Sequence, residues 1–112
     1  MAQLPQDIEP QISRFYLSGN KLNNSLSNAT FIRYRHIVYL DLSNNSLSRL
    51  PAGIFLLLFR LRILDLRENL LTHVPNSTFL GLANLRTLHL AGNSIISLDT
   101  WAFYGLSSLS TL

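Results

Sequence analysis

Hydrophobic residues recur along the chain in one fixed frame, and the whole frame repeats every 24 residues. The frame L-x-x-L-x-L-x-x-N-x-L fits three times in register, starting at Ile37, Leu61 and Leu85. An earlier copy starts at Ile12, one residue out of phase, and a further copy begins at Leu109. We therefore predict four complete repeats and a truncated fifth over residues 12–112.

Each position of the frame has a physical role. The L-x-L segment alternates leucines with variable residues, which predicts a short strand whose leucines turn inward. The chain must bend at the asparagine that follows, where a side-chain amide can satisfy backbone groups that the bend leaves unpaired. We expect this role for a structural ladder of asparagines: Asn20, Asn45, Asn69 and Asn93.

The second half of each repeat predicts an extended return segment. Leu50-Pro51 and Val74-Pro75 start it, since proline fixes φ and keeps the preceding residue out of the helical region. Phenylalanines spaced 24 residues apart then fill the core from the outer side as a spine: Phe31, Phe55, Phe79 and Phe103. The pattern predicts a repeat solenoid with a short parallel β-sheet on the concave face and extended or 3₁₀ segments on the convex face.

Composition excludes several other classes of protein. Apolar residues make up 47% of the chain and charged residues 13%, which excludes a disordered chain. The longest fully non-polar run, Ala52 to Phe59, is far shorter than a membrane-spanning helix, so we expect no membrane segment. The net charge is only +3 and the arginines are scattered, which argues against a nucleic-acid partner. Cysteine is absent, which excludes disulfides and thiolate metal sites.

The unit L-x-x-L-x-L-x-x-N-x-L-x-x-L-P-x-x-x-F-x-x-L-x-x resembles the typical 24-residue class of leucine-rich repeats. Such repeats occur in Toll-like receptors, variable lymphocyte receptors and many neuronal and matrix proteins. The resemblance implies a right-handed solenoid arc of α/β type. Residues 1–11 are similar to the segment that joins an N-terminal cap to the first repeat, and we interpret them as a cap remnant.

The resemblance also implies a function. It indicates a ligand-recognition module of a secreted or cell-surface receptor of innate immunity, with a protein or microbial ligand on the concave face. A cell-adhesion or matrix protein remains an alternative, and so does an intracellular scaffold, because cysteine is absent. The missing caps suggest a fragment of a longer ectodomain, with a naturally short protein as the alternative.

Four N-x-S/T sequons favour an extracellular glycoprotein. They begin at Asn23, Asn28, Asn44 and Asn76. Asn44 lies beside the ladder residue Asn45, close to the concave face.

Binding must use residues that the repeat frame leaves free. An exposed sheet does not need Tyr or Ile for its own stability, whereas Tyr and Arg often anchor interfaces. We therefore predict a concave patch formed by Tyr16, Tyr39, Asp41, Ile63, Asp65, Arg67 and His89. Asp65 and His89 fall in one column of adjacent strands, so we expect their backbones to lie about 4.8 Å apart and the two side chains to form an acid–histidine pair.

Nothing in the chain indicates an enzyme. The three histidines fall at different places in the repeat, so we expect no metal or other cofactor, and there is no nucleophile or phosphate-binding motif. The last coil is expected to be open on one side. Leu106, Leu109 and Leu112 are expected to face solvent and to promote self-association through an open end.

Overall fold

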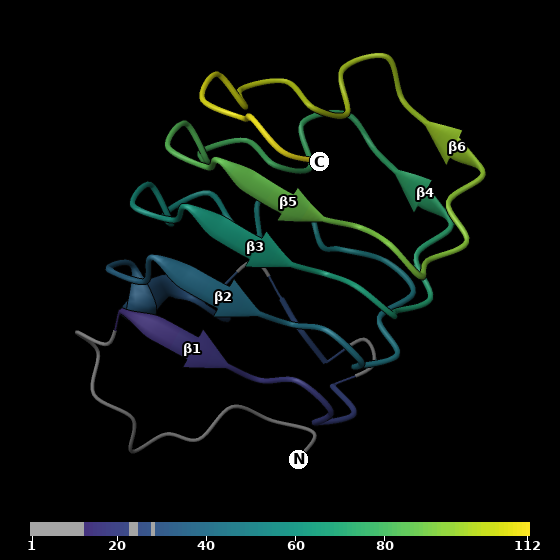
Figure 1. Cartoon of the computed structure of the whole chain (residues 1–112), viewed down its shortest axis with the longest axis horizontal. Coiled ribbons are helices and arrows are strands. Elements are labelled where there is room, and N and C mark those ends of the chain that lie inside the picture. Colours follow the sequence, from purple (N-terminus) through teal and green to yellow (C-terminus); the bar gives the residue numbers. More distant parts are fainter. Residues whose placement is uncertain (1–12, 23–24, 28) are drawn as a thin grey trace.

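The structure is a computed structural model that describes residues 13–22, 25–27 and 29–112. Each coil contributes one short strand to a parallel sheet, in the order β1 (Arg14–Tyr16), β2 (Tyr39–Asp41), β3 (Ile63–Asp65) and β5 (Thr87–His89). The four strands lie side by side along one side of a stack of coils (Figure 1). The predicted repeat solenoid with a short parallel sheet is confirmed. The predicted cap remnant and the sequons at Asn23 and Asn28 lie outside the described residues.

The register of the sheet follows the 24-residue period. Phe15 pairs with Leu40, Leu40 with Leu64, and Leu64 with Leu88, and all four side chains are buried. The strand ends continue the same ladder, with Leu42 N–H donating to Asp65 O at 2.8 Å. Because strand side chains alternate between faces, burial of these residues turns their neighbours outward.

The recurring asparagines close the bend after each strand. The Oδ1 of Asn45 accepts hydrogen bonds from the N–H groups of Asn20 (2.9 Å) and Leu22 (3.3 Å) in the preceding coil. Its Nδ2 donates to three carbonyls, those of Leu17, Leu42 and Ser43. Asn69 repeats the arrangement one coil later, with Oδ1 on the N–H groups of Asn45 and Leu47. The amides of Asn45 and Asn69 therefore each join their own coil to the one before it.

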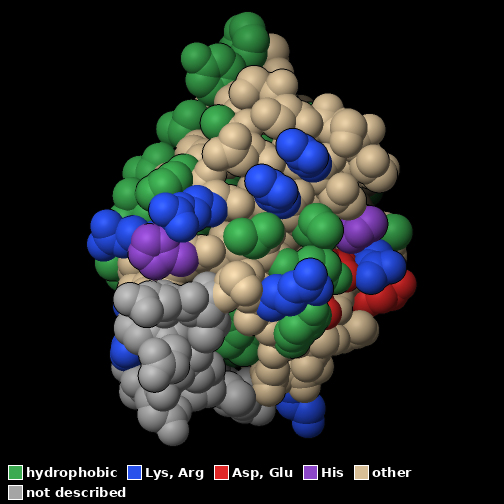
Figure 2. Space-filling view, turned by 60° about the vertical axis from the view of Figure 1, so that its left-hand side comes forward, with side chains coloured by type: hydrophobic (Ala, Val, Ile, Leu, Met, Phe, Trp, Pro, Cys, Tyr) green, Lys and Arg blue, Asp and Glu red, His purple; other side chains and the backbone are tan. Residues whose placement is uncertain are grey.

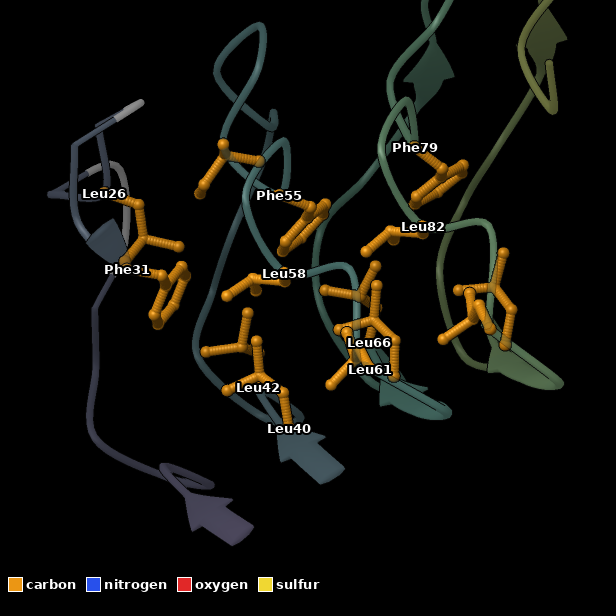
Figure 3. Close-up of a cluster of buried hydrophobic side chains, with 14 of the residues drawn as sticks. Leu26, Phe31, Leu40, Leu42, Phe55, Leu58, Leu61, Leu66, Phe79 and Leu82 are labelled. Carbon is orange, nitrogen blue, oxygen red and sulfur yellow. The ribbon is translucent and has the colours of Figure 1, made fainter. Parts of the chain in front are cut away.

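The phenylalanines stack through the outer half of the core. Successive ring centroids lie 6.4, 6.2 and 6.0 Å apart from Phe31 to Phe103, and the rings are close to parallel. After each ring the chain makes two tight turns, as in the bonds from Leu58 N–H to Phe55 O and from Leu61 N–H to Leu58 O. In the first coil this segment forms the 3₁₀ helix η1 (Ile32–Tyr34). Figure 3 shows leucines from the strands and from these turns meeting the Phe side chains between the two sides of the solenoid.

A second, two-stranded sheet was not predicted. β4 (His73–Val74) and β6 (Ser97–Leu98) pair in parallel, with His73 opposite Ser97 and Val74 opposite Leu98. The Val74-Pro75 segment was expected to be extended, and the equivalent segment of the next coil lies beside it. Two adjacent extended segments satisfy their main-chain hydrogen-bonding groups by pairing, as in the bond from Asp99 N–H to Val74 O at 3.0 Å.

The last coil departs from expectation. Leu106 and Leu109 were expected to face solvent, but both are partly buried against the core, and only Leu112 is largely exposed. The turns after Phe103 fold this segment back onto the preceding coil, and Thr111 forms a parallel bridge with Thr87. Self-association through this end stays a prediction.

The ladder predicts a graded response to substitution. Asn45→Ala leaves several buried backbone groups without partners and should lower the free energy of unfolding by about 4 kcal/mol. Asn20→Ala should cost about 1 kcal/mol, because the Asn20 side chain is half-buried and bonds mainly to Leu17 O. Urea denaturation of the two variants measures the difference. Equal losses would contradict the assignment of the ladder as the link between coils.

Candidate recognition surface

The variable residues of the four strands form aligned columns on the face of the sheet that points away from the core, the predicted concave face. The register places Arg14, Tyr39, Ile63 and Thr87 in one column. It places Tyr16, Asp41, Asp65 and His89 in the next. All the residues of the predicted concave patch therefore lie on this sheet or directly after it, as Arg67 does.

Aromatic and basic side chains meet at the β1–β2 end of the patch. The rings of Tyr16 and Tyr39 lie 5.3 Å apart with a tilt of 41°. The guanidinium of Arg14 lies 5.9 Å above the centroid of Tyr39, and its Nη1 donates to the Tyr16 hydroxyl at 3.4 Å. Tyr16 is nevertheless 57% exposed. These contacts order three large side chains while leaving their surfaces free for a partner.

A short polar network follows at the end of β2. The Oδ1 of Asp41 accepts hydrogen bonds from the backbone N–H and the hydroxyl of Ser43, at 2.9 and 2.6 Å. The Ser43 hydroxyl in turn lies 3.0 Å from that of Ser18 in the preceding coil. The Asp41 carboxylate is thus fixed in place, and its Oδ2 has no bond partner recorded within the described part of the chain.

Asp65 departs from the predicted role of a ligand contact. It is only 1% exposed, and its carboxylate is held by Arg67 through Nε at 2.9 Å and Nη2 at 2.6 Å. The backbone N–H of Arg67 also donates to it, at 3.0 Å. Asp65 and His89 do lie opposite each other on adjacent strands, as predicted, but the hydrogen bonds to the Asp65 carboxylate come from Arg67. Asp65 positions the half-exposed guanidinium of Arg67, and Arg67 is the member of the pair that a ligand can reach.

Electrostatics on the patch follow from these contacts. Burial by itself raises the pKa of Asp65, but the hydrogen bonds and the charge of Arg67 outweigh it, so the net pKa lies below its ordinary value. Burial raises the pKa of Tyr39, and the carboxylates of Asp41 and Asp65 raise it further. At neutral pH the patch therefore presents a carboxylate paired with arginine beside a protonated tyrosine hydroxyl.

The bend beyond the patch requires left-handed backbone in every coil. The residues before the ladder asparagines all have positive φ: Gly19 (73°), Asn44 (55°), Glu68 (56°) and Gly92 (74°). The Glu68 side chain lies directly over Gly92, where an added Cβ would clash with its carboxylate. Asn44 is exposed at this bend, beside the patch. The rim of the patch is thus set by backbone geometry as well as by side chains.

One polar cluster on the two-stranded sheet of β4 and β6 was not predicted from the sequence. The Nδ1 of His73 lies 2.5 Å from the Ser97 hydroxyl, and its Nε2 lies 3.4 Å from Oδ1 of Asp99. The order of these groups matches a serine–histidine–acid relay, but the site is exposed and lacks the water-excluding cleft that such chemistry uses. The cluster instead joins β4 to the segment after β6. Only the predicted repeat alignment, which sets His73 opposite Ser97, relates these residues in the sequence.

Lys and Arg side chains are spread between hydrophobic ones on the face shown in Figure 2, and acidic side chains gather at one edge of it.

Among the described residues, no group of three or more His, Cys, Asp or Glu side chains lies close enough to hold a metal ion. Within the same residues, no helix has the length and hydrophobicity needed to cross a bilayer.

Sequence comparison identifies the repeat. Models described as "Leucine Rich Repeat" and "Leucine rich repeat" match residues 36–57 and 59–112. The chain is a leucine-rich repeat protein. No curated protein matches it in sequence. Leucine-rich repeat proteins are typically non-enzymatic and bind proteins or other ligands.

One solved structure is similar to part of this chain. It is described as "Crystal structure of TLR13-ssRNA13 complex", with 20% sequence identity to this leucine-rich repeat chain and a TM-score of 0.46. The match covers 91% of this chain and 20% of the solved chain. This leucine-rich repeat chain therefore spans about one fifth of the length of that structure.

The Asp65–Arg67 pair predicts a specific acid dependence of stability. A carboxyl group whose pKa is lowered on folding stabilises the fold above its unfolded value near 3.8, and this stabilisation is lost as the pH falls below that value. Asp65→Asn should therefore flatten the loss of stability on acidification, measured as urea midpoints from about pH 5 to pH 2.5. Arg67→Ala should flatten it similarly. Profiles parallel to the wild-type profile in both variants would rule out the pair as a source of acid sensitivity.

Proposed function

We propose that this chain is a ligand-recognition module of a secreted or cell-surface leucine-rich repeat receptor. The ligand, a protein or a microbial product, binds the concave patch. The observation that carries the proposal is the ordered cluster of Arg14, Tyr16 and Tyr39 on an exposed sheet. These side chains contribute nothing to the buried core, yet three contacts fix their positions.

The chemistry of the patch favours a partner with acidic and flat apolar groups. Arg14 on β1 and Arg67 after β3 present donors to carboxylates or phosphates. Tyr16, Tyr39 and Ile63 on the same sheet offer apolar area with little side-chain entropy to lose on binding. Further basic side chains, Arg62 and Arg86, are exposed just before β3 and β5. The patch is therefore expected to bind an acidic surface with aromatic or aliphatic groups at its centre.

The placement in innate immunity rests on resemblance alone. The Toll-like and variable-lymphocyte-receptor repeats and the adhesion or matrix repeats share the frame found here, and an intracellular scaffold could share it too. A receptor role predicts binding to microbial products, whereas an adhesion role predicts binding to ectodomains or matrix proteins. A panel that contains both kinds of ligand therefore separates the two roles.

Tyr16→Ala tests the patch against a matched control. Tyr16 and Tyr104 are both 57% exposed, but only Tyr16 lies on the concave sheet. The full chain is presented to secreted and cell-surface ectodomains and to purified microbial lipids, glycans and nucleic acids, and affinities are measured by biolayer interferometry. For any ligand bound by the wild type, Tyr16→Ala and Tyr39→Ala should weaken affinity by about 30-fold, as expected for an interface anchor.

The control decides whether the concave patch is the site. Tyr104→Ala and Arg60→Ala remove exposed side chains away from the sheet and should leave affinity unchanged. Equal losses in the control and the patch variants, or unchanged affinity in both patch variants, would contradict binding through this face.

A further inference from the structure

A shallow groove lies on the lateral side of the solenoid, away from the concave patch. It is lined by Asn76 and Ser77 after β4 and by Trp101 and Tyr104 after β6. The two aromatic rings meet edge to face with centroids 6.2 Å apart, yet Trp101 is 59% and Tyr104 57% exposed. Neither side chain is needed for the core. Asn76 begins the sequon Asn76-Ser77-Thr78 and is itself exposed, so an attachment site for a glycan opens into an aromatic groove.

The structure fixes the direction of the Asn76 side chain. Its backbone N–H donates to Oδ2 of Asp99 at 3.0 Å, and its Oδ1 accepts from the N–H of Trp101 at 2.8 Å. The neighbouring Ser77 N–H donates to Trp101 O at 3.0 Å. With Oδ1 held on the next coil, the planar amide leaves a single direction for Nδ2. No partner of Nδ2 is recorded among the described residues, and Nδ2 is the atom to which an N-linked glycan is attached.

We propose that Asn76 carries an N-linked glycan whose first N-acetylglucosamine packs on Trp101 and Tyr104. The inference rests on that part of the proposed function which places the chain in the secretory pathway. A sugar ring presents an apolar C–H face that packs on aromatic rings, and packing would cover apolar surface that the fold leaves open. A glycosylated asparagine keeps its carbonyl, so the bond from Trp101 N–H to Oδ1 persists after modification.

The chemistry of attachment uses a lipid-linked oligosaccharide as the donor. The Asn76 Nδ2 forms a bond to the anomeric carbon of N-acetylglucosamine and loses one proton. The anomeric C–O bond to a polyprenyl diphosphate breaks, and the diphosphate leaves with the electron pair of that bond. In the folded chain the Thr78 hydroxyl is buried and donates to Pro75 O at 2.7 Å. Attachment therefore precedes closure of this coil, when the sequon is still extended and accessible.

Trp101 provides a direct readout, because it is the only tryptophan in the chain. The full chain is secreted from mammalian cells that add high-mannose glycans and is then trimmed with endoglycosidase H to one N-acetylglucosamine per site. Peptide mass spectrometry measures occupancy at Asn76. Acrylamide quenching should be about twofold weaker in the trimmed glycoprotein than in the unmodified chain made in bacteria, because the sugar shields the indole.

Two sequon variants assign the effect to one site. Thr78→Val removes the Asn76 sequon but keeps Asn76 and its bond to Trp101, so it should restore the stronger quenching of the unmodified chain. Ser46→Gly removes the Asn44 sequon and suits the positive φ at that position, so the shielding should persist. In the trimmed glycoprotein, Tyr104→Ala should reduce the shielding, since it removes one of the two aromatic rings of the groove.

An unoccupied Asn76 in the secreted protein overturns the proposal, and so does an occupied Asn76 with unchanged quenching of Trp101. Failure of the concave-patch proposal has a different signature. Ligand affinity would then be insensitive to Tyr16→Ala, whatever the state of the glycan.

Discussion

Every coil of the solenoid ends its strand in a bend, and the bend leaves main-chain N–H and carbonyl groups inside the protein, where water does not reach them. One asparagine amide per coil satisfies them. The Oδ1 of Asn45 takes two N–H groups of the preceding coil, and its Nδ2 serves carbonyls of both coils. Because a buried polar group without a partner costs about 1–3 kcal/mol, the bend is stable only with this side chain in place. The same amide sets the distance and register between neighbouring coils.

The concave surface depends on that register. With the leucines and asparagines fixed, the residues between them are brought into columns whose composition the fold does not restrict. Ser43 contacts Ser18 because the two serines occupy equivalent positions in adjacent coils. Tyr16 contacts Tyr39 diagonally, because Tyr39 lies opposite Arg14 on the neighbouring strand, two residues from the partner of Tyr16. The residues that we propose for recognition are thus positioned by the repeat fold, and most of them add little to its stability. Apart from the buried Asp65 and its partner Arg67, substitutions in the patch are therefore expected to change binding far more than stability, and substitutions in the ladder the reverse.

The sequence predicts those features that repeat, and it is weakest on contacts that occur once. Leucine, asparagine and phenylalanine positions recur every 24 residues, so the sheet, the ladder and the spine all follow from spacing. Burial of Asp65 does not follow, since it depends on how the Arg67 side chain folds back over a central strand. The partial burial of Leu106 and Leu109 depends on turns that bring the last coil onto its neighbour. Alignment of the repeats places Asn76 beside the next coil. It does not predict the hydrogen bond from Trp101 N–H that orients the Asn76 amide.

The central claim is that the asparagine amides join the coils into one cooperative unit, and native-state hydrogen exchange tests it most directly. The N–H groups of Leu22, Leu47 and Leu71 donate to ladder Oδ1 atoms rather than to main-chain carbonyls. They should exchange as slowly as the strand-end amides of Leu42 and Leu66, with the free energy of global unfolding. Exchange of the three ladder-bound amides that is orders of magnitude faster than that of Leu42 and Leu66 would contradict the account.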